Sequence, residues 1–497
     1  MNTPKLSETG FSMSQSLNYI TGIVKKISSN RVVNNFSTLT ISNILVQGIT
    51  IFSSIKIARS LAPDDFGLFS YLLALSYIYY ILGGLGMRQV IIRTVAVHPS
   101  QSTILFKKSF VLRMLMFLPL VAGILIYNSY FSKIKLDEVS LFLLGGNILF
   151  LSIWDTLESI NYGHQNMKLP SLVQLVFTVL WVIIILVLPV NLIQVNVVLG
   201  ITVILQILKT SSLYLFSVRK NFISFVNNTK ETLQVNLVKE SSSFFLLSVF
   251  TLITTQIPVV YLEQNSTDTE IAYYNIALRI IGPVQMLLLT FMNVLYPVIA
   301  RIFAKDTNKF SNTIKNVYIF LLILGNAGAF TLSLFSKELI ILMYGDAYGQ
   351  ATQVFNIQIW YTILYSTLCY IGMILSAINK QVLLAKLSFA YALIATPSLF
   401  IGSKFGAFGL SVGFLVGALL NLSYHYYYLQ KSLPEEIPWK VISISFAVFF
   451  LLMLVTYFSH DLHMAYKVLI GFATLSILGF VLRTQIKTTI QQIMRSQ

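Results

Sequence analysis

The chain alternates long apolar runs with short polar segments along most of its length. A membrane-spanning helix needs about 20 apolar residues, and fourteen runs meet that length. These are residues 36–61, 66–86, 109–131, 139–161, 169–190, 196–216, 241–262, 271–299, 316–336, 351–378, 382–401, 405–429, 441–459 and 464–482. The pattern predicts an all-α polytopic membrane protein without a soluble domain, because the spans leave only short loops.

A polar turn at residues 62–65, Ala-Pro-Asp-Asp, separates the first two runs. Pro63 fixes its own φ and biases the residue before it away from helix, so the first helix is expected to end there. Asp64 and Asp65 then start the next helix, where carboxylates favour the positive end of the dipole. Gly67 is expected to let two backbones approach closely.

A fainter copy of this turn lies about 205 residues later, where residues 269–274 align with residues 64–69. We interpret the repeat as a duplication of six spans, which gives two halves of the same orientation around a central cavity. The expected organisation is a cytoplasmic amphipathic segment at 1–33, an N-terminal half at 34–220, a cytoplasmic linker at 221–240, a C-terminal half at 241–430, and helices 13 and 14 with a cytoplasmic tail at 431–497.

Composition and charge agree with a membrane protein. Hydrophobic residues make up 56% and charged residues 10% of the chain, whereas soluble domains carry about 25% charge. The net charge of +16 gathers in the segments predicted to be cytoplasmic, as the positive-inside rule requires. Both termini are therefore expected in the cytoplasm, and no basic segment accompanies a nucleic-acid-binding module.

No residue pattern predicts catalysis. The five histidines lack metal-ligand spacing, and no phosphate-binding glycine-rich motif is present. The one cysteine, Cys369, lies inside an apolar run and allows no internal disulfide. We expect no catalytic residue, no metal and no cofactor, and coupling to a H⁺ or Na⁺ gradient stays open.

Two acidic residues lie inside the fourth run. Asp155 and Glu158 are three residues apart and share a helix face. An ionised side chain costs about 2.5–3.5 kcal/mol at mid-membrane unless it is paired or hydrated. Two roles are open: an ion pair with a basic residue of a neighbouring helix, or a proton or cation site used in transport.

Three basic residues also lie within spans. Lys56 and Arg59 are at the outer end of the first span, where their stems can reach the outer interface. Arg279 lies about two turns into the eighth span. If the three converge between the halves, they form a cationic substrate-binding site, and arginine is well suited to bind phosphate because its planar fork donates two parallel hydrogen bonds.

The sequence resembles the polysaccharide biosynthesis transporter family, the O-antigen and exopolysaccharide repeat-unit flippases of the multidrug/oligosaccharidyl-lipid/polysaccharide exporter superfamily. The resemblance is carried by LAPDDFGLFSYLLAL at 61–75, GLGMRQVIIRTVA at 84–96, ESINYGHQNMKLP at 158–170 and EIAYYNIALRIIGPVQMLLLTFMNVLYPVIARIF at 270–303. One departure is Gln256 in the seventh span, where such proteins often carry an acidic residue.

The resemblance implies a flippase that moves undecaprenyl-pyrophosphate-linked oligosaccharide repeat units across the bacterial cytoplasmic membrane by alternating access. Its implied partners are this lipid-linked glycan, membrane lipid and a polysaccharide polymerase complex. Lys56, Arg59 and Arg279 would attract the pyrophosphate. Two alternatives stay open: a Na⁺- or H⁺-coupled multidrug exporter of the same fold that depends on Asp155 and Glu158, and a scaffold that transports nothing.

Overall fold

A computed structural model describes residues 31–224, 236–305, 307–433, 439–459, 462–474 and 476. All regular structure in these ranges is helical, and twelve helices are long and apolar enough to cross a membrane. They correspond to the first twelve predicted runs and confirm the all-α polytopic fold. Helix α17 (Trp439–Ser459) covers the thirteenth run. An apolar helix at Met464–Thr474 begins the fourteenth. Residues 1–30, most of the predicted linker and the tail lie outside the described residues.

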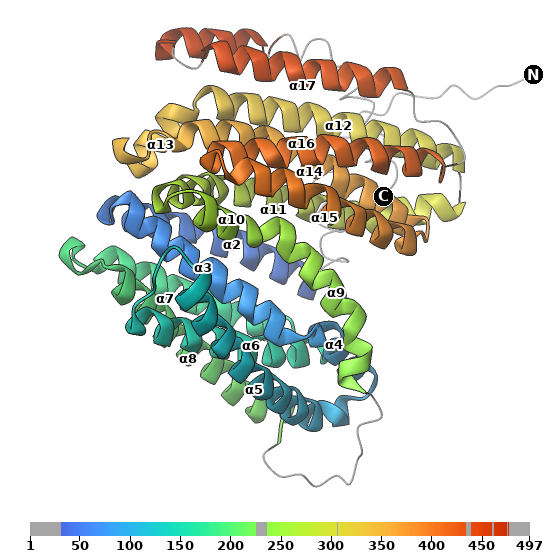
Figure 1. The fold of residues 1–497 in the computed structure, drawn as a ribbon. Coiled ribbons are helices and arrows are strands. Elements are labelled where there is room, and N and C mark those ends of the chain that lie inside the picture. The colour runs from blue at the N-terminus through green and yellow to red at the C-terminus, as the bar shows by residue number, and fades with distance from the viewer. Residues whose placement is uncertain are drawn as a thin grey trace, which may run out of the picture.

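The helices form two bundles (Figure 1). The N-terminal bundle consists of α2 (Arg31–Ser60), α3 (Pro63–Gly84), α4 (Met87–Val97), α5 (Ser102–Ile126), α6 (Glu138–Gly163), α7 (Lys168–Val187) and α8 (Val195–Arg219). The C-terminal bundle consists of α9 (Leu237–Thr255), α10 (Ile257–Asn265), α11 (Asp268–Lys305), α12 (Thr307–Leu334), α13 (Ser336–Tyr344), α14 (Ala351–Ala377), α15 (Gln381–Ser403) and α16 (Gly406–Gln430). Helix α17 lies along the far side of the C-terminal bundle, packed on α12.

The contacts between bundles repeat in a two-fold manner. Helix α3 packs along α11, its counterpart under the proposed duplication. Helix α2 packs on α7 of its own bundle and on α11 of the other, and α9 likewise packs on α15 and on α3. The aligned residues Thr269 and Asp64 hydrogen-bond to each other. Contact between equivalent positions is expected at a two-fold axis, and it supports the proposed division into halves.

The polar turn lies at this axis. Pro63 opens α3 and Asp64 and Asp65 occupy its first turn, as the sequence predicts. A Cβ on Gly67 would lie 1.9 Å from the carbonyl oxygen of Asp268. The expected close approach of two backbones at Gly67 is confirmed, and the second backbone is the start of α11.

A second break, between α3 and α4, brings the bundles together at their other end. Leu85 and Gly86 both have positive φ, 49° and 69°. A Cβ on Gly86 would lie 2.4 Å from the backbone nitrogen of Phe245 in α9. Glycine is therefore required here twice, for its backbone conformation and for the approach of α9. Figure 1 shows α9 running from α10 in one bundle to α4 in the other.

Candidate functional site

The two acidic residues of α6 belong to an ionic network inside the N-terminal bundle. Arg88 of α4 donates to Asp155 Oδ1 at 2.5 Å and to Glu158 Oε2 at 2.7 Å. Arg113 of α5 donates to Asp155 Oδ2 at 2.6 Å. Three helices thus place two arginines against two carboxylates, and these four charges cancel.

Two tyrosines complete the network. Tyr80 donates to Asp155 Oδ1 and Tyr162 donates to Glu158 Oε1, each at 3.1 Å. Every oxygen of the two carboxylates therefore has a donor. Asp155 is 4% exposed and Arg113 is 2% exposed, and ions buried to this extent need such partners. The structure shows the first of the two predicted roles, pairing with neighbouring helices.

Two basic residues of this bundle were missed. Only Lys56, Arg59 and Arg279 are expected within spans, but Arg113 and Lys209 also lie inside the bundle. Lys209 Nζ lies 4.5 Å from the ring centre of Trp154 and donates to Gln174 Oε1 at 2.9 Å. It lines a cavity of about 170 Å³ between α2, α7 and α8. The signal was available, because both residues fall within predicted apolar runs, 109–131 and 196–216.

We define the outer seam as the junction of the bundles formed by residues 58–67, 127–134, 263–271 and 342–348, at the end predicted to face outside. A buried carboxylate lies in it, that of Glu263 of α10, which is 2% exposed. Glu263 Oε1 accepts hydrogen bonds from Ser132 Oγ at 2.9 Å and from the backbone nitrogens of Lys133 and Ile134 at 2.5 and 3.0 Å. One carboxylate thus ties the α5–α6 connection to the C-terminal bundle.

Arg59 contributes to the same seam as a structural contact. Its side chain is exposed and donates to the carbonyl oxygens of Leu342 and of Met343, the latter at 2.9 Å. A cation near the last carbonyls of a helix is favoured, so Arg59 holds α2 against the end of α13. Tyr348 donates to the carbonyl oxygen of Ala58 at 2.8 Å. Burial raises the pKa of Tyr348, which keeps this hydroxyl protonated as a donor.

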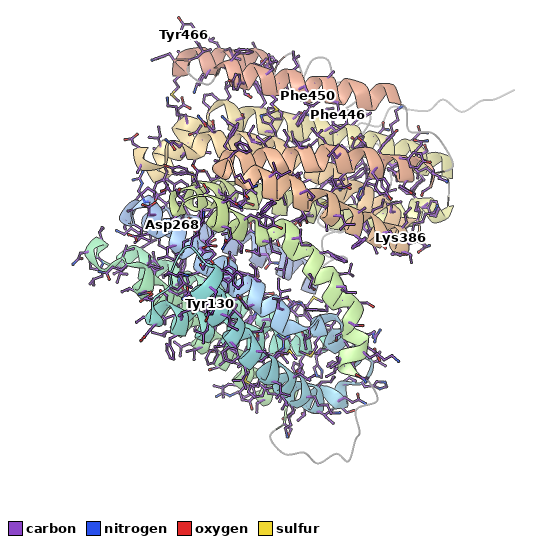
Figure 2. The ribbon with its side chains drawn as sticks, in the orientation of Figure 1. Tyr130, Asp268, Lys386, Phe446, Phe450 and Tyr466 are labelled. Carbon is purple, nitrogen blue, oxygen red and sulfur yellow. The ribbon has the colours of Figure 1, made fainter. Side chains whose placement is uncertain are left out.

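Arg279 lies beside the outer seam on α11 and is half-buried. Its guanidinium carbon is 5.1 Å from the ring centre of Phe66, the first apolar residue after the polar turn. That ring meets the ring of Tyr348 edge-on at 6.0 Å. No carboxylate in the described part of the chain forms an ion pair with Arg279, and its charge packs on an aromatic face. Figure 2 labels Asp268, which starts α11, where the two bundles meet.

Lys56 is half-buried on α2. Among the described residues, no direct contact joins Lys56 or Arg59 to Arg279; Arg59 instead uses its donors on α13. The structure thus brings Arg279 to the polar turn, and it keeps the other two cations at separate positions along α2.

We define the inner seam as the junction of residues 86–93 with residues 240–245, at the end predicted to face the cytoplasm. Arg93 of α4 and Glu240 of α9 form an ion pair there. Both side chains are exposed, at 61% and 37%. The inner seam therefore consists of the Gly86 approach and a solvated ion pair, both made to α9.

Comparison with known proteins decides the family. A family model described as polysaccharide biosynthesis protein matches residues 32–303, more than half of the chain. The chain belongs to this family. All four motifs of the predicted resemblance start inside the matched range, and the resemblance is confirmed.

Solved structures of similar fold were also found. Lipid II flippase MurJ in an inward closed conformation matches with a TM-score of 0.69 and 17% identity, over 90% of this chain and 99% of that chain. An inward-facing multidrug resistance MATE family transporter of the MOP superfamily matches with a TM-score of 0.62 and 12% identity, over 77% and 94%. Identities this low show the fold alone. The chain matches no curated protein by sequence.

Proposed function

We propose that the protein is a flippase that moves polyprenyl-pyrophosphate-linked oligosaccharide repeat units across the bacterial cytoplasmic membrane, by alternating access, for surface polysaccharide biosynthesis. The charge balance of the interior carries this proposal. The carboxylates of Asp155 and Glu158 are neutralised by arginines. Among the described residues, Arg279 and Lys209 form no ion pair. An interior with surplus positive charge suits an anionic cargo.

The cargo needs such an interior. A bare ion costs tens of kcal/mol to move into hydrocarbon, so a pyrophosphate crosses only with substitute solvation. Arg279 supplies a fork of donors for phosphate oxygens. Lys56, half-buried on α2, is a candidate second cation, whereas Arg59 has to release α13 before it can bind phosphate. The polyprenyl tail can stay in lipid throughout.

The cation-exporter alternative depends on Asp155 and Glu158. Each oxygen of these carboxylates already accepts a hydrogen bond from an arginine or a tyrosine. A cation would have to displace an arginine to reach them. The network therefore favours the flippase over an exporter that depends on these acids, and coupling to H⁺ or Na⁺ is part of the proposal only as an energy source.

The proposed setting follows from the charge pattern and the family. Both termini lie in the cytoplasm, because the predicted inner segments hold most of the lysines and arginines. A polysaccharide polymerase that uses the exported repeat units is the proposed protein partner.

The direct test is deletion of the gene in the organism that produces the glycan. Lipid-linked repeat units should then accumulate, and the share that impermeant periodate oxidises from outside spheroplasts should fall at least tenfold. A plasmid copy of the gene should restore both. An unchanged share would overturn the proposal. Sensitivity to cationic drugs in the deletion strain would favour the exporter, and restoration by a copy lacking Arg279, Lys209 and Lys56 would favour the scaffold.

A further inference from the structure

The C-terminal bundle contains two adjoining cavities of about 640 and 580 Å³. Both are lined by Tyr365, Ser388 and Tyr391, so we treat them as one space and name it the tyrosine chamber. Its walls come from α9, α11, α14, α15 and α16. Each cavity falls within the range of about 300–1,000 Å³ found for pockets that enclose small ligands.

The chemistry of the walls is neutral, polar and aromatic. No Asp, Glu, Lys or Arg is among the described residues that line either cavity. Tyr361 and Tyr391 face each other with their hydroxyl oxygens 3.3 Å apart. Tyr274 and Gln285 line the same space. Rings that offer an apolar face, together with amides and hydroxyls that both donate and accept, suit a flat ligand rich in hydroxyl groups.

One wall residue has an unused acceptor. Asn421 of α16 is 1% exposed, and no described donor lies within hydrogen-bond distance of its Oδ1. Leaving a buried acceptor unpaired costs about 1–3 kcal/mol. Asn421 and the neighbouring His425, which is 4% exposed, line the larger cavity. Because Oδ1 has almost no exposed surface, the amide has to rotate towards the cavity before a ligand hydroxyl can donate to it.

The chamber lies close to the proposed phosphate site. Leu278, the residue before Arg279 on α11, lines the chamber. The chamber is also walled by Thr251 and Thr254 of α9, the helix that forms the inner seam. The Arg279 position and the chamber are therefore next to each other along α11.

We propose that the tyrosine chamber binds the uncharged sugar rings of the lipid-linked oligosaccharide, by stacking on tyrosine rings and by hydrogen bonds to amides and hydroxyls. This inference rests on the proposed flippase function and assigns its cargo two separate sites. Charge is recognised at Arg279 and sugar is recognised inside the C-terminal bundle.

One residue can report whether the tyrosine chamber is occupied. Cys369 is the only cysteine of the sequence and lines the larger cavity. Its labelling by N-ethylmaleimide is measured in cells that make the glycan and in cells that lack the transferase for the first sugar phosphate. We expect labelling at least threefold slower in the producing cells. Equal labelling in the two strains, whatever its level, would overturn the inference, as would protection by tetraphenylphosphonium and not by glycan production.

A pair of variants separates this inference from the proposed function. Tyr391→Ala should lower export of the glycan at least tenfold, while Tyr391→Phe, which keeps the ring, should retain more of it. Tyr427→Ala is the matched control, because Tyr427 lies on α16 and is 60% exposed. Normal export by Tyr391→Ala would overturn the proposal that the chamber binds sugar and would leave the proposed flippase function intact. Export that survives deletion of the gene would overturn the proposed flippase function. If Tyr391→Ala does not accumulate, the Cys369 measurement on the unaltered chain decides.

Discussion

The two seams between the bundles differ in kind. The outer seam joins α2, α3 and the α5–α6 connection to α10, α11 and α13 through polar contacts, and those of Glu263 and Tyr348 are buried. The inner seam consists of contacts to α9 and an exposed ion pair. Buried polar contacts cost more to break than solvated ones. The outer seam is therefore the more firmly held of the two, and the contacts of the inner seam are made to one helix, α9.

This difference gives the proposed alternating access a physical form. Opening towards the cytoplasm requires movement of α9 away from α4, whereas opening outward requires new donors for Glu263 and new acceptors for Arg59. Arg279 lies beside the outer seam, at Phe66. A phosphate that enters from the inner end and binds Arg279 would draw the guanidinium from the aromatic ring, and so it would weaken the seam that has to open next.

The largest effect is expected from a residue that belongs to neither seam. Asp155→Ala leaves Arg88 and Arg113 without this acceptor, and Arg113 is 2% exposed. Breaking a buried ion pair costs about 3–5 kcal/mol, so the variant should have a lower free energy of unfolding. It should not shift the protein towards opening at either the outer or the inner end. Thermal unfolding of the purified protein measures the loss of stability. Glu158→Gln should cost less, because Glu158 is 19% exposed.

The same network separates a structural role from a transport role. Asp155→Asn combined with Arg113→Met removes both partners, and such replacements are often close to neutral for stability. We expect the double variant to recover both the unfolding temperature and glycan export. Recovery of the unfolding temperature without recovery of export would contradict a purely structural role for the Asp155–Arg113 pair. It would mean that Asp155 takes part in transport.

Glu263→Ala should open the outer seam. The backbone nitrogens of Lys133 and Ile134 lose their acceptor, at about 1–3 kcal/mol for each unsatisfied group. Hydrogen exchange at residues 132–134 should accelerate by about tenfold or more. Glu138→Ala is the control, since Glu138 is an exposed carboxylate at the start of α6. Equal hydrogen-exchange rates in both variants would show that Glu263 does not hold the outer seam together.

Gly67→Ala tests the close approach at the axis. The added Cβ would lie 1.9 Å from the Asp268 carbonyl oxygen, so α3 and α11 have to separate, at about 1–3 kcal/mol. Gly48→Ala is the matched control because nothing lies within 4 Å of its Cβ position, and it should be neutral or stabilising by up to about 1 kcal/mol. Similar unfolding temperatures for the two variants would contradict the contact.

The smallest effect is expected at the inner seam. Arg93→Ala removes an ion pair whose side chains are 61% and 37% exposed, and such pairs contribute about 0–1 kcal/mol. The unfolding temperature should change by no more than about a degree or two, and less at high salt. A large loss would mean that the two seams are of similar strength.

The sequence predicts well those features that depend on a single helix. Span lengths, the turn at Pro63 and the need for glycine at position 67 follow from apolar runs and backbone sterics. The partners of Asp155 come from α4 and α5, and those of Glu263 from the α5–α6 connection, so they depend on how helices pack. Arg113 and Lys209 each lie near one end of an apolar run, where the pattern alone does not distinguish a buried charge from one at the membrane surface. Whether a charge at such a position is buried depends on how the neighbouring helices pack against it.

The central claim is that Arg279 binds the anionic group of the cargo. Glycan export is compared in cells that carry Arg279→Ala, Arg279→Lys and the control Lys404→Ala, whose cation packs on Phe400 in a contact of the same type at 5.2 Å. We expect export to fall at least tenfold for Arg279→Ala, to be retained in part for Arg279→Lys and to be unchanged for Lys404→Ala, at equal protein levels. Unchanged export by Arg279→Ala would contradict the account.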